Sequence, residues 1–285
     1  MNPSDFQHEY DLTALQLIRP RGHPFEMEVT PRYLHHYVHN SYEPFTADLL
    51  ANLLFSQRLF IDVGAHYGFY TLLAVTRHSR LEVLALEPVQ ESYTVLTRNI
   101  ERNGVKGVRA LQRAASDCDG RALFNISLSS DNYSFYPHPV APPVYQIEVD
   151  TMTIDTLLRD HAPCPTVIKM DTEGHELKVL EGMKDTLARF RDLSLVVEFN
   201  PKMLKRAGHA PEDLLEKLER LGFMSSSLTT ASAGRRSSPI HNPGKHLSIR
   251  RATSICTAHG GTGRWACASL PTRRGSAERS AAFSN

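Results

Sequence analysis

Short apolar runs alternate with amphipathic segments between residues 58 and 199 of the chain. Five of these runs have the near-continuous apolar character of strands that are buried on both faces of a sheet. They lie at residues 59–63, 82–87, 108–112, 166–171 and 194–199. Between the runs, apolar residues recur at helical spacing, as Phe69, Leu72 and Leu73 do after the first run. This alternation predicts an α/β fold in which a doubly wound, mostly parallel sheet carries helices on both faces.

Two other regions carry recognisable patterns. Residues 121–128 and 144–150 are strand-like and flank a loop, 128–143, that contains three aromatic residues and four prolines. This loop is either a lid or wall of a substrate pocket or an ordinary surface excursion. Further along, a helix begins near Pro211, and Gly222 ends it.

The chain divides into three predicted parts. We expect residues 1–50 to cover the sheet edge or the substrate site, and residues 51–224 to form the main domain. Residues 225–285 hold nine Lys or Arg, one acid and twelve serines, so the tail carries +8 and the rest of the chain −7. A basic tail can bind nucleic acid or membrane lipid, but this composition without periodicity is typical of a disordered segment. An out-of-frame terminus would have the same composition, and no nucleic-acid partner is expected.

Composition narrows the class of protein further. With 285 residues, of which 41% are hydrophobic, the chain can bury a full core. No apolar stretch approaches the roughly 20 residues that span a bilayer, and the first residues show no basic segment followed by an apolar one. The four cysteines form no CxxC pair. These features predict a cytoplasmic protein without a membrane span, and they leave its oligomeric state open.

A glycine-spaced turn follows the first predicted strand. It contains Asp62, Gly64, His66 and Gly68, and the next helix presents free amide groups there. The pattern is not GxGxxG, because His66 occupies the middle glycine position, and no Walker sequence is present. A site that binds a pyrophosphate would benefit from glycine at that position, whereas a site that binds the amino-acid end of a cofactor tolerates a side chain. The turn therefore favours S-adenosylmethionine over NAD, although a purely structural turn would also use glycines.

Acidic residues follow the second and third strands. Glu87 comes at the tip of the second strand, where a carboxylate can accept hydrogen bonds from ribose hydroxyls. The alternative for Glu87 is a solvated strand end. Asp117 follows the third strand at a position from which it, or a neighbouring amide, would reach an adenine amino group, but its surroundings also describe a plain turn.

Candidate catalytic residues cluster after the fourth strand. Asp171, Glu173 and His175 lie at the carboxyl edge of the sheet, where open α/β proteins bind ligands. Asp171 or His175 could accept a proton from a substrate hydroxyl, with Glu173 as the orienting group. Alternatively, the two acids cap the helix that follows. Glu198, in the fifth strand, is a secondary candidate at the same edge.

Several motifs in series carry a family resemblance: FIDVGAHYGFYT, LALEPVQESYTVLTRNIERNGV, TIDTLL, IKMDTEGHELKVLEGM and LVVEFNP. Over roughly residues 40–223 the chain resembles the FkbM-type methyltransferases, within the class I, Rossmann-like, S-adenosylmethionine-dependent fold. The resemblance implies that Asp62, Gly64, Gly68, Glu87 and Asp117 surround the cofactor and that Asp171 and Glu173 lie at the active edge. It also implies O-methylation of a small-molecule or glycan hydroxyl, on a sugar, lipid or secondary metabolite.

Two positions depart from the family pattern. His66 stands where asparagine is usual, and both side chains form hydrogen bonds. Class I methyltransferases usually end in an antiparallel strand pair, whereas the chain after residue 223 predicts no such pair, so the sheet edge would be incomplete. An incomplete edge raises the alternative of a catalytically silent cofactor-binding protein, and an NAD-dependent oxidoreductase is a further alternative. No metal site is predicted, although Asp171 and Glu173 could hold Mg²⁺ together with an acceptor diol.

Overall fold

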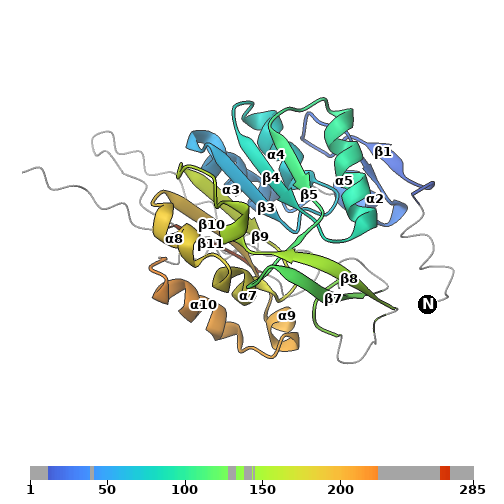
Figure 1. Cartoon of the computed structure of the whole chain (residues 1–285). Helices are drawn as coiled ribbons and strands as arrows, with labels where there is room; N and C mark the ends of the chain where they lie inside the picture. The colour runs from blue at the N-terminus through green and yellow to red at the C-terminus, as the bar shows by residue number, and fades with distance from the viewer. Residues whose placement is uncertain are drawn as a thin grey trace, which may run out of the picture.

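The structure is a computed structural model of the 285-residue chain. It describes residues 12–38, 42–127, 133–137, 143 and 145–223, and the backbone alone of 264–269. Figure 1 shows a central sheet between helices, with a smaller β-ribbon projecting from it. No helix within these described ranges is long and apolar enough to cross a bilayer.

A six-stranded sheet forms the centre of the molecule. In spatial order its strands are β11 (Arg264–Ser269), β10 (Leu193–Phe199), β9 (Thr166–Met170), β3 (Leu59–Val63), β4 (Glu82–Leu86) and β5 (Val108–Leu111). The strands from β10 to β5 are parallel to their neighbours, and β11 pairs antiparallel with β10. All five predicted strands belong to this sheet, which confirms the α/β fold with a mostly parallel sheet.

Alternate residues of each strand point to opposite faces of the sheet, and both faces are buried. Phe60 and Val83 belong to one hydrophobic cluster, whereas Ile61 and Leu84 belong to another. The first cluster includes residues of α3 (Pro44–Leu53), η1 (Leu54–Ser56), α4 (Phe69–Arg77) and α5 (Gln90–Arg102). The second includes residues of α6 (Ile154–Leu157), α7 (Glu176–Glu181), α9 (Pro201–Arg206) and α10 (Pro211–Arg220), and Leu187 of α8 (Lys184–Arg189) packs against it. Burial on both sides accounts for the uninterrupted apolar runs of the sequence.

The N-terminal segment packs beside α5. Strands β1 (Gln16–Ile18) and β2 (Met27–Val29) form an antiparallel pair, and α2 (Pro31–Val38) follows. The buried Asn99 side chain holds β2 in place: its Oδ1 accepts from the Glu28 amide at 2.6 Å and its Nδ2 donates to the Glu28 carbonyl at 3.1 Å. In Figure 1 this hairpin and α2 lie next to α5 at one side of the molecule.

The two strand-like segments predicted at residues 121–128 and 144–150 belong to a second, three-stranded sheet. Its order is β6 (Ala114–Ala115), β8 (Tyr145–Met152) and β7 (Gly120–Ile126), with β7 and β8 antiparallel. Figure 1 shows β7 and β8 projecting together from the main body. Of the loop 128–143, residues 133–137 and 143 are described, and a β-bridge joins Ser134 to Asn125.

The C-terminal part of the chain contributes a strand that the sequence analysis did not predict. Strand β11 pairs with β10 along its outer edge, from Ser194 opposite Ser269 to Phe199 opposite Arg264. The edge of β10 is therefore paired rather than exposed, and within the described residues β11 is one strand of the expected pair, without a second beside it. The remainder of the tail, 225–263 and 270–285, lies outside the described residues.

Candidate active site

A pocket opens at the carboxyl edge of the parallel strands, where the sequence analysis expected a ligand. It is bounded by the ends of β3, β4, β6 and β9, by α2 and by the segment 133–137. Its lining includes Gly64, His66, Glu87, Asp171 and Glu173 among the predicted site residues. Five of the nine predicted residues thus line one pocket, and Asp62, Gly68, Asp117 and His175 lie outside its lining.

The glycines of the turn are required by backbone geometry. Gly64 has φ +74°, and a Cβ at that position would lie 1.9 Å from the Asp171 carbonyl oxygen. Gly68, at the start of α4, has φ +89°, and its Cβ would lie 2.6 Å from Leu96 Cδ1. Gly64 therefore lets the turn approach β9, whereas Gly68 allows close packing of α4 on α5.

His66 stands between these glycines and also has a left-handed backbone, with φ +50°. Its ring stacks on Tyr67 with centroids 3.8 Å apart and meets the edge of Tyr33 at 5.1 Å. Its backbone amide points to the end of the neighbouring strand, where Glu87 Oε2 accepts from it at 2.9 Å. The side chain that departs from the family pattern is thus part of the aromatic wall of the pocket.

Glu87 lies directly after β4 and is only 6% exposed. Besides the His66 amide, the Val89 amide donates to its Oε1 at 3.0 Å. Burial raises the pKa of Glu87 to about 7, although these two amides and Lys169 act in the opposite direction. The two amides fix the carboxylate at the pocket wall, beside the glycine turn.

Asp62 lies beneath the turn, fully buried, and takes part in a charge network that the sequence analysis missed. Lys169 Nζ is 3.2 Å from Asp62 Oδ1, 3.1 Å from the Gly64 carbonyl oxygen and 3.7 Å from Asp171 Oδ2. Thr71 Oγ1 donates to Asp62 Oδ2 at 2.8 Å. Burial alone would lower the pKa of Lys169, but the charges of Asp62 and Asp171 raise it above its usual value. A lysine inside the apolar run of β9 was the one local sign of this network.

A second buried pair adjoins the network. The Tyr70 hydroxyl donates to the carboxylate of Glu43, the residue before α3. Burial, and then the charge of Asp171, raises the pKa of Glu43 to about 7. Lys169 Nζ lies 5.2 Å from the centre of the Tyr70 ring. Neither residue has a local sequence signal, because the pair joins positions 27 residues apart.

The predicted acidic edge after β9 is a tight reversal. Asp171 and Glu173 both line the pocket, and Glu173 has φ +52°. Glu176 holds the turn from inside: its Oε1 accepts from the Thr172 amide at 3.1 Å, the Thr172 hydroxyl at 2.9 Å and the Gly174 amide at 3.3 Å. Glu176 therefore closes the turn that precedes α7, no described side chain caps the helix start, and Asp171 and Glu173 lie at the pocket.

His175 does not reach the pocket, contrary to its expected place among the bases. Its Nε2 is 3.0 Å from Ser116 Oγ and its Nδ1 is 3.0 Å from the Tyr136 hydroxyl. Burial lowers the pKa of His175 to about 4. The ring stacks on Phe135 with centroids 4.0 Å apart, and Phe135 lines the pocket. This geometry fits a residue that positions the wall rather than one that accepts a proton from substrate.

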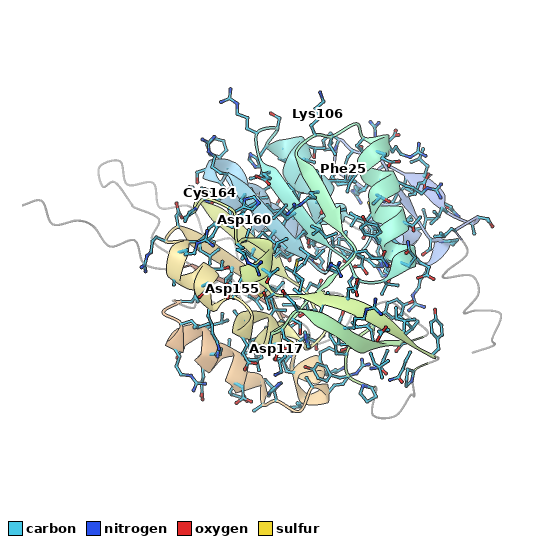
Figure 2. The ribbon with its side chains drawn as sticks, viewed as in Figure 1. Phe25, Lys106, Asp117, Asp155, Asp160 and Cys164 are labelled. Atoms are coloured by element: carbon cyan, nitrogen blue, oxygen red, sulfur yellow. The ribbon has the colours of Figure 1, made fainter. Side chains whose placement is uncertain are left out.

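Asp117 is also placed differently from the expectation. Its Oδ2 is 2.9 Å from Lys178 Nζ, and this hydrogen bond is the main reason that its pKa is lowered. The pocket wall next to it is formed by Arg113, Ala114 and Ala115. Figure 2 shows Asp117 near the lower helices of the molecule. Contact of its carboxylate with an adenine therefore has no support from the pocket geometry.

The acidic edge includes one further carboxylate. Glu198, near the end of β10, is 5% exposed, and burial together with Glu173 and Asp171 raises its pKa well above the usual value. Carboxylate oxygens of Asp171, Glu173 and Glu198 all lie within 4.8 Å of one another. Within the described residues, these three acids form the group with the spacing of a cation site.

The sheet order, with its pocket at the carboxyl edge, defines the Rossmann-like fold of the class I methyltransferases. The sequence matches the model of the methyltransferase FkbM domain over residues 62–224, more than half of the chain. The chain therefore belongs to the FkbM methyltransferase family, as the sequence motifs indicated.

Two named methyltransferases and one solved structure are similar to this chain. The chain is 30% identical to hexuronic acid methyltransferase AglP of Haloferax volcanii over 165 residues, which are 55% of this chain and 59% of that protein. It is 26% identical to Methyltransferase 1 of Beauveria bassiana over 144 residues, 44% of this chain and 58% of that protein. Among solved structures, M. jannaschii TYW2 in complex with AdoMet aligns with a TM-score of 0.44 and 12% identity, over 90% of this chain and 85% of that one. The matched region thus spans less than two thirds of either curated relative.

Proposed function

We propose that the protein is an S-adenosylmethionine-dependent O-methyltransferase whose acceptor is a hydroxyl of a sugar, lipid or secondary metabolite. The observation that carries the proposal is Glu87, a buried carboxylate fixed by two backbone amides at the wall of a pocket beside the glycine turn. Membership of the FkbM family supports methyl transfer. The relative named as a hexuronic acid methyltransferase supports a sugar as acceptor.

The residues at the ends of β3 and β4 suit the cofactor. Gly64 lines the pocket, and Glu87 can accept hydrogen bonds from two ribose hydroxyls. Val89, Ala114 and Ala115 offer a small apolar surface to a flat base. S-adenosylmethionine, when bound, supplies a methyl group on a positively charged sulfur.

The opposite side of the pocket suits a hydroxyl-bearing acceptor. Tyr37 and Tyr42 provide flat apolar faces, and Asp171 and Glu173 provide hydrogen-bond acceptors. We assign to Asp171 the removal of the hydroxyl proton, because its carboxylate lines the pocket whereas His175 does not. Most of the rate would come from holding the acceptor oxygen in line with the methyl group.

Calorimetric titration of the folded protein with S-adenosylmethionine tests the cofactor assignment. We expect binding, and we expect Glu87→Gln to weaken it by on the order of 1–3 kcal/mol, because a charged acceptor of the ribose is lost. Glu82→Gln is the matched control, since Glu82 lies at the opposite, exposed end of the same strand. Absence of binding to a folded sample would refute the proposal.

Turnover distinguishes an enzyme from a silent cofactor-binding protein. Incubation with S-adenosylmethionine and a panel of sugars, lipids and polyketide-like alcohols should release S-adenosylhomocysteine with at least one class of acceptor. Tight cofactor binding without product from any class would favour the silent alternative. Oxidation of an alcohol with reduction of NAD, followed by absorbance, would instead favour the oxidoreductase.

A further inference from the structure

Three carboxylates converge at the edge of the sheet beside the pocket. Asp171 and Glu173 follow β9, and Glu198 belongs to the neighbouring strand β10. One oxygen of each lies within 4.8 Å of the others. Three negative charges at this spacing repel one another strongly, so a positive charge or a proton must compensate them. Lys169, 3.7 Å from Asp171, offsets part of this charge but lies on the Asp62 side of the cluster.

Glu198 gives a second, independent indication of a ligand. Its side chain is 5% exposed, and its Oε2 is buried and has no hydrogen-bond partner among the described residues. Its other oxygen accepts from Asn200 Nδ2 at 3.3 Å. A buried carboxylate oxygen without a donor is unfavourable, and in proteins such groups are paired or coordinate metal ions.

The spacing fits a cation that prefers oxygen ligands. Three oxygens spread evenly around one ion lie about 3.6 Å apart for Mg²⁺ and about 4.2 Å apart for Ca²⁺, and two oxygens on opposite sides lie somewhat further apart. The three separations, none above 4.8 Å, therefore suit Ca²⁺ after a small contraction of the cluster and Mg²⁺ or Mn²⁺ after a larger one. The donor set consists of carboxylates alone, which favours these hard cations over zinc or copper.

We propose that Asp171, Glu173 and Glu198 bind one divalent cation of the Mg²⁺, Mn²⁺ or Ca²⁺ type at the edge of the pocket. Glu198 holds the ion from the buried side, and Asp171 and Glu173 connect it to the pocket that they line. We expect the remaining coordination positions of the ion to face that pocket. If the proposed methyl transfer holds, which this step rests on, those positions would bind two neighbouring oxygens of the acceptor and make its hydroxyl more acidic.

Manganese binding to the full chain tests the site directly. The protein is treated with EDTA, dialysed and titrated with MnCl₂, and free Mn²⁺ is followed by electron paramagnetic resonance. We expect one Mn²⁺ per chain, competition by Mg²⁺ or Ca²⁺, and at least about tenfold weaker binding in Glu198→Gln. The exposed Glu212→Gln at the start of α10 is the control and should bind as the wild type does.

The glutamine variant preserves the shape of the side chain and removes one charge from a crowded cluster, so its fold should persist. Near-ultraviolet circular dichroism checks this, and Asp171→Asn is a second variant with the same expected loss. Equal Mn²⁺ affinity in Glu198→Gln and wild type, or no Mn²⁺ binding at millimolar concentration, would overturn the inference and indicate that a proton compensates the cluster.

The outcome is separable from that of the proposed function. S-adenosylmethionine is titrated into the same metal-free protein, where the Glu87 side of the pocket is intact. Cofactor binding without Mn²⁺ binding would overturn the cation site alone. Mn²⁺ binding without cofactor binding would overturn the methyltransferase proposal and leave the cation site standing.

Discussion

Lys169→Met tests whether the charge network beneath the glycine turn stabilises the fold. The ammonium of Lys169 lies 3.2 Å from Asp62 Oδ1, and both side chains are buried. Methionine has a similar length and no charge, so the substitution removes the ionic partner with little change in packing volume.

The magnitude follows from what Asp62 loses. Breaking a buried ion pair by removal of one partner costs about 3–5 kcal/mol, because the remaining charge is uncompensated. Asp62 would keep the Thr71 hydroxyl as donor, whereas Asp171, with 24% of its side chain exposed, would regain contact with water. We therefore expect a loss of unfolding free energy of about 3 kcal/mol, which comes mainly from Asp62.

The assay is urea denaturation followed by circular dichroism, for Lys169→Met, Asp62→Asn and the double variant. In the double variant no buried charge is left alone at this position, so its loss should be smaller than the sum of the single losses by at least about 1 kcal/mol. A loss of less than about 1 kcal/mol in Lys169→Met, or strict additivity of the two changes, would refute the network as a stabilising unit.

Two further predictions concern the turn and the raised carboxyl pKa values. Gly64→Ala should destabilise the protein far more than Gly22→Ala, since both have positive φ but only at Gly64 would the new Cβ meet a backbone oxygen, that of Asp171, at 1.9 Å; equal melting temperatures in a thermal scan would contradict this. Because the pKa values of Glu43 and Glu87 rise from 4.5 to about 7 on folding, the folded state binds these protons more tightly, and unfolding free energy should fall as pH rises from about 4.5 to about 7. Glu87→Gln should flatten this slope in denaturation curves measured across that range, and an unchanged slope would show that burial does not raise that pKa.

The sheet was predictable because its strands are buried on both faces. A strand such as β3 has no solvent face, so four of its five residues are apolar, and Asp62, next to its last residue, is the exception. Strand β11 lacked such a signal. Its sequence, RWACAS, is short and rich in small residues, and its pairing with β10 depends on residues about 70 positions away. Long-range pairing of this kind leaves no local periodicity.

The site was predictable where a residue's role depends on its position at a strand end. Glu87 follows β4, and the expectation that it reaches the pocket is consistent with its place in the pocket lining. Asp117 and His175 also lie near strand ends, but their side chains turn to Lys178 and to the Ser116 and Tyr136 hydroxyls. The position of a residue after a strand therefore predicts that it lies at this edge of the sheet. The direction of its side chain depends on partners from other elements, which the local sequence does not show.

Lys169 shows how the parallel register couples the fold to the site. The register places Asp62 of β3 directly beside Lys169 of β9, although 107 positions separate them. Because both side chains are buried, the ammonium needs hydrogen-bond acceptors and negative charge from the protein. Asp62, the Gly64 carbonyl and Asp171, at the pocket edge, provide them. A single substitution at Lys169 therefore disturbs the glycine turn and the acidic edge together. Variants at Glu87 and Glu198, on separate strands and outside this ion pair, are the ones that can distinguish cofactor binding from cation binding.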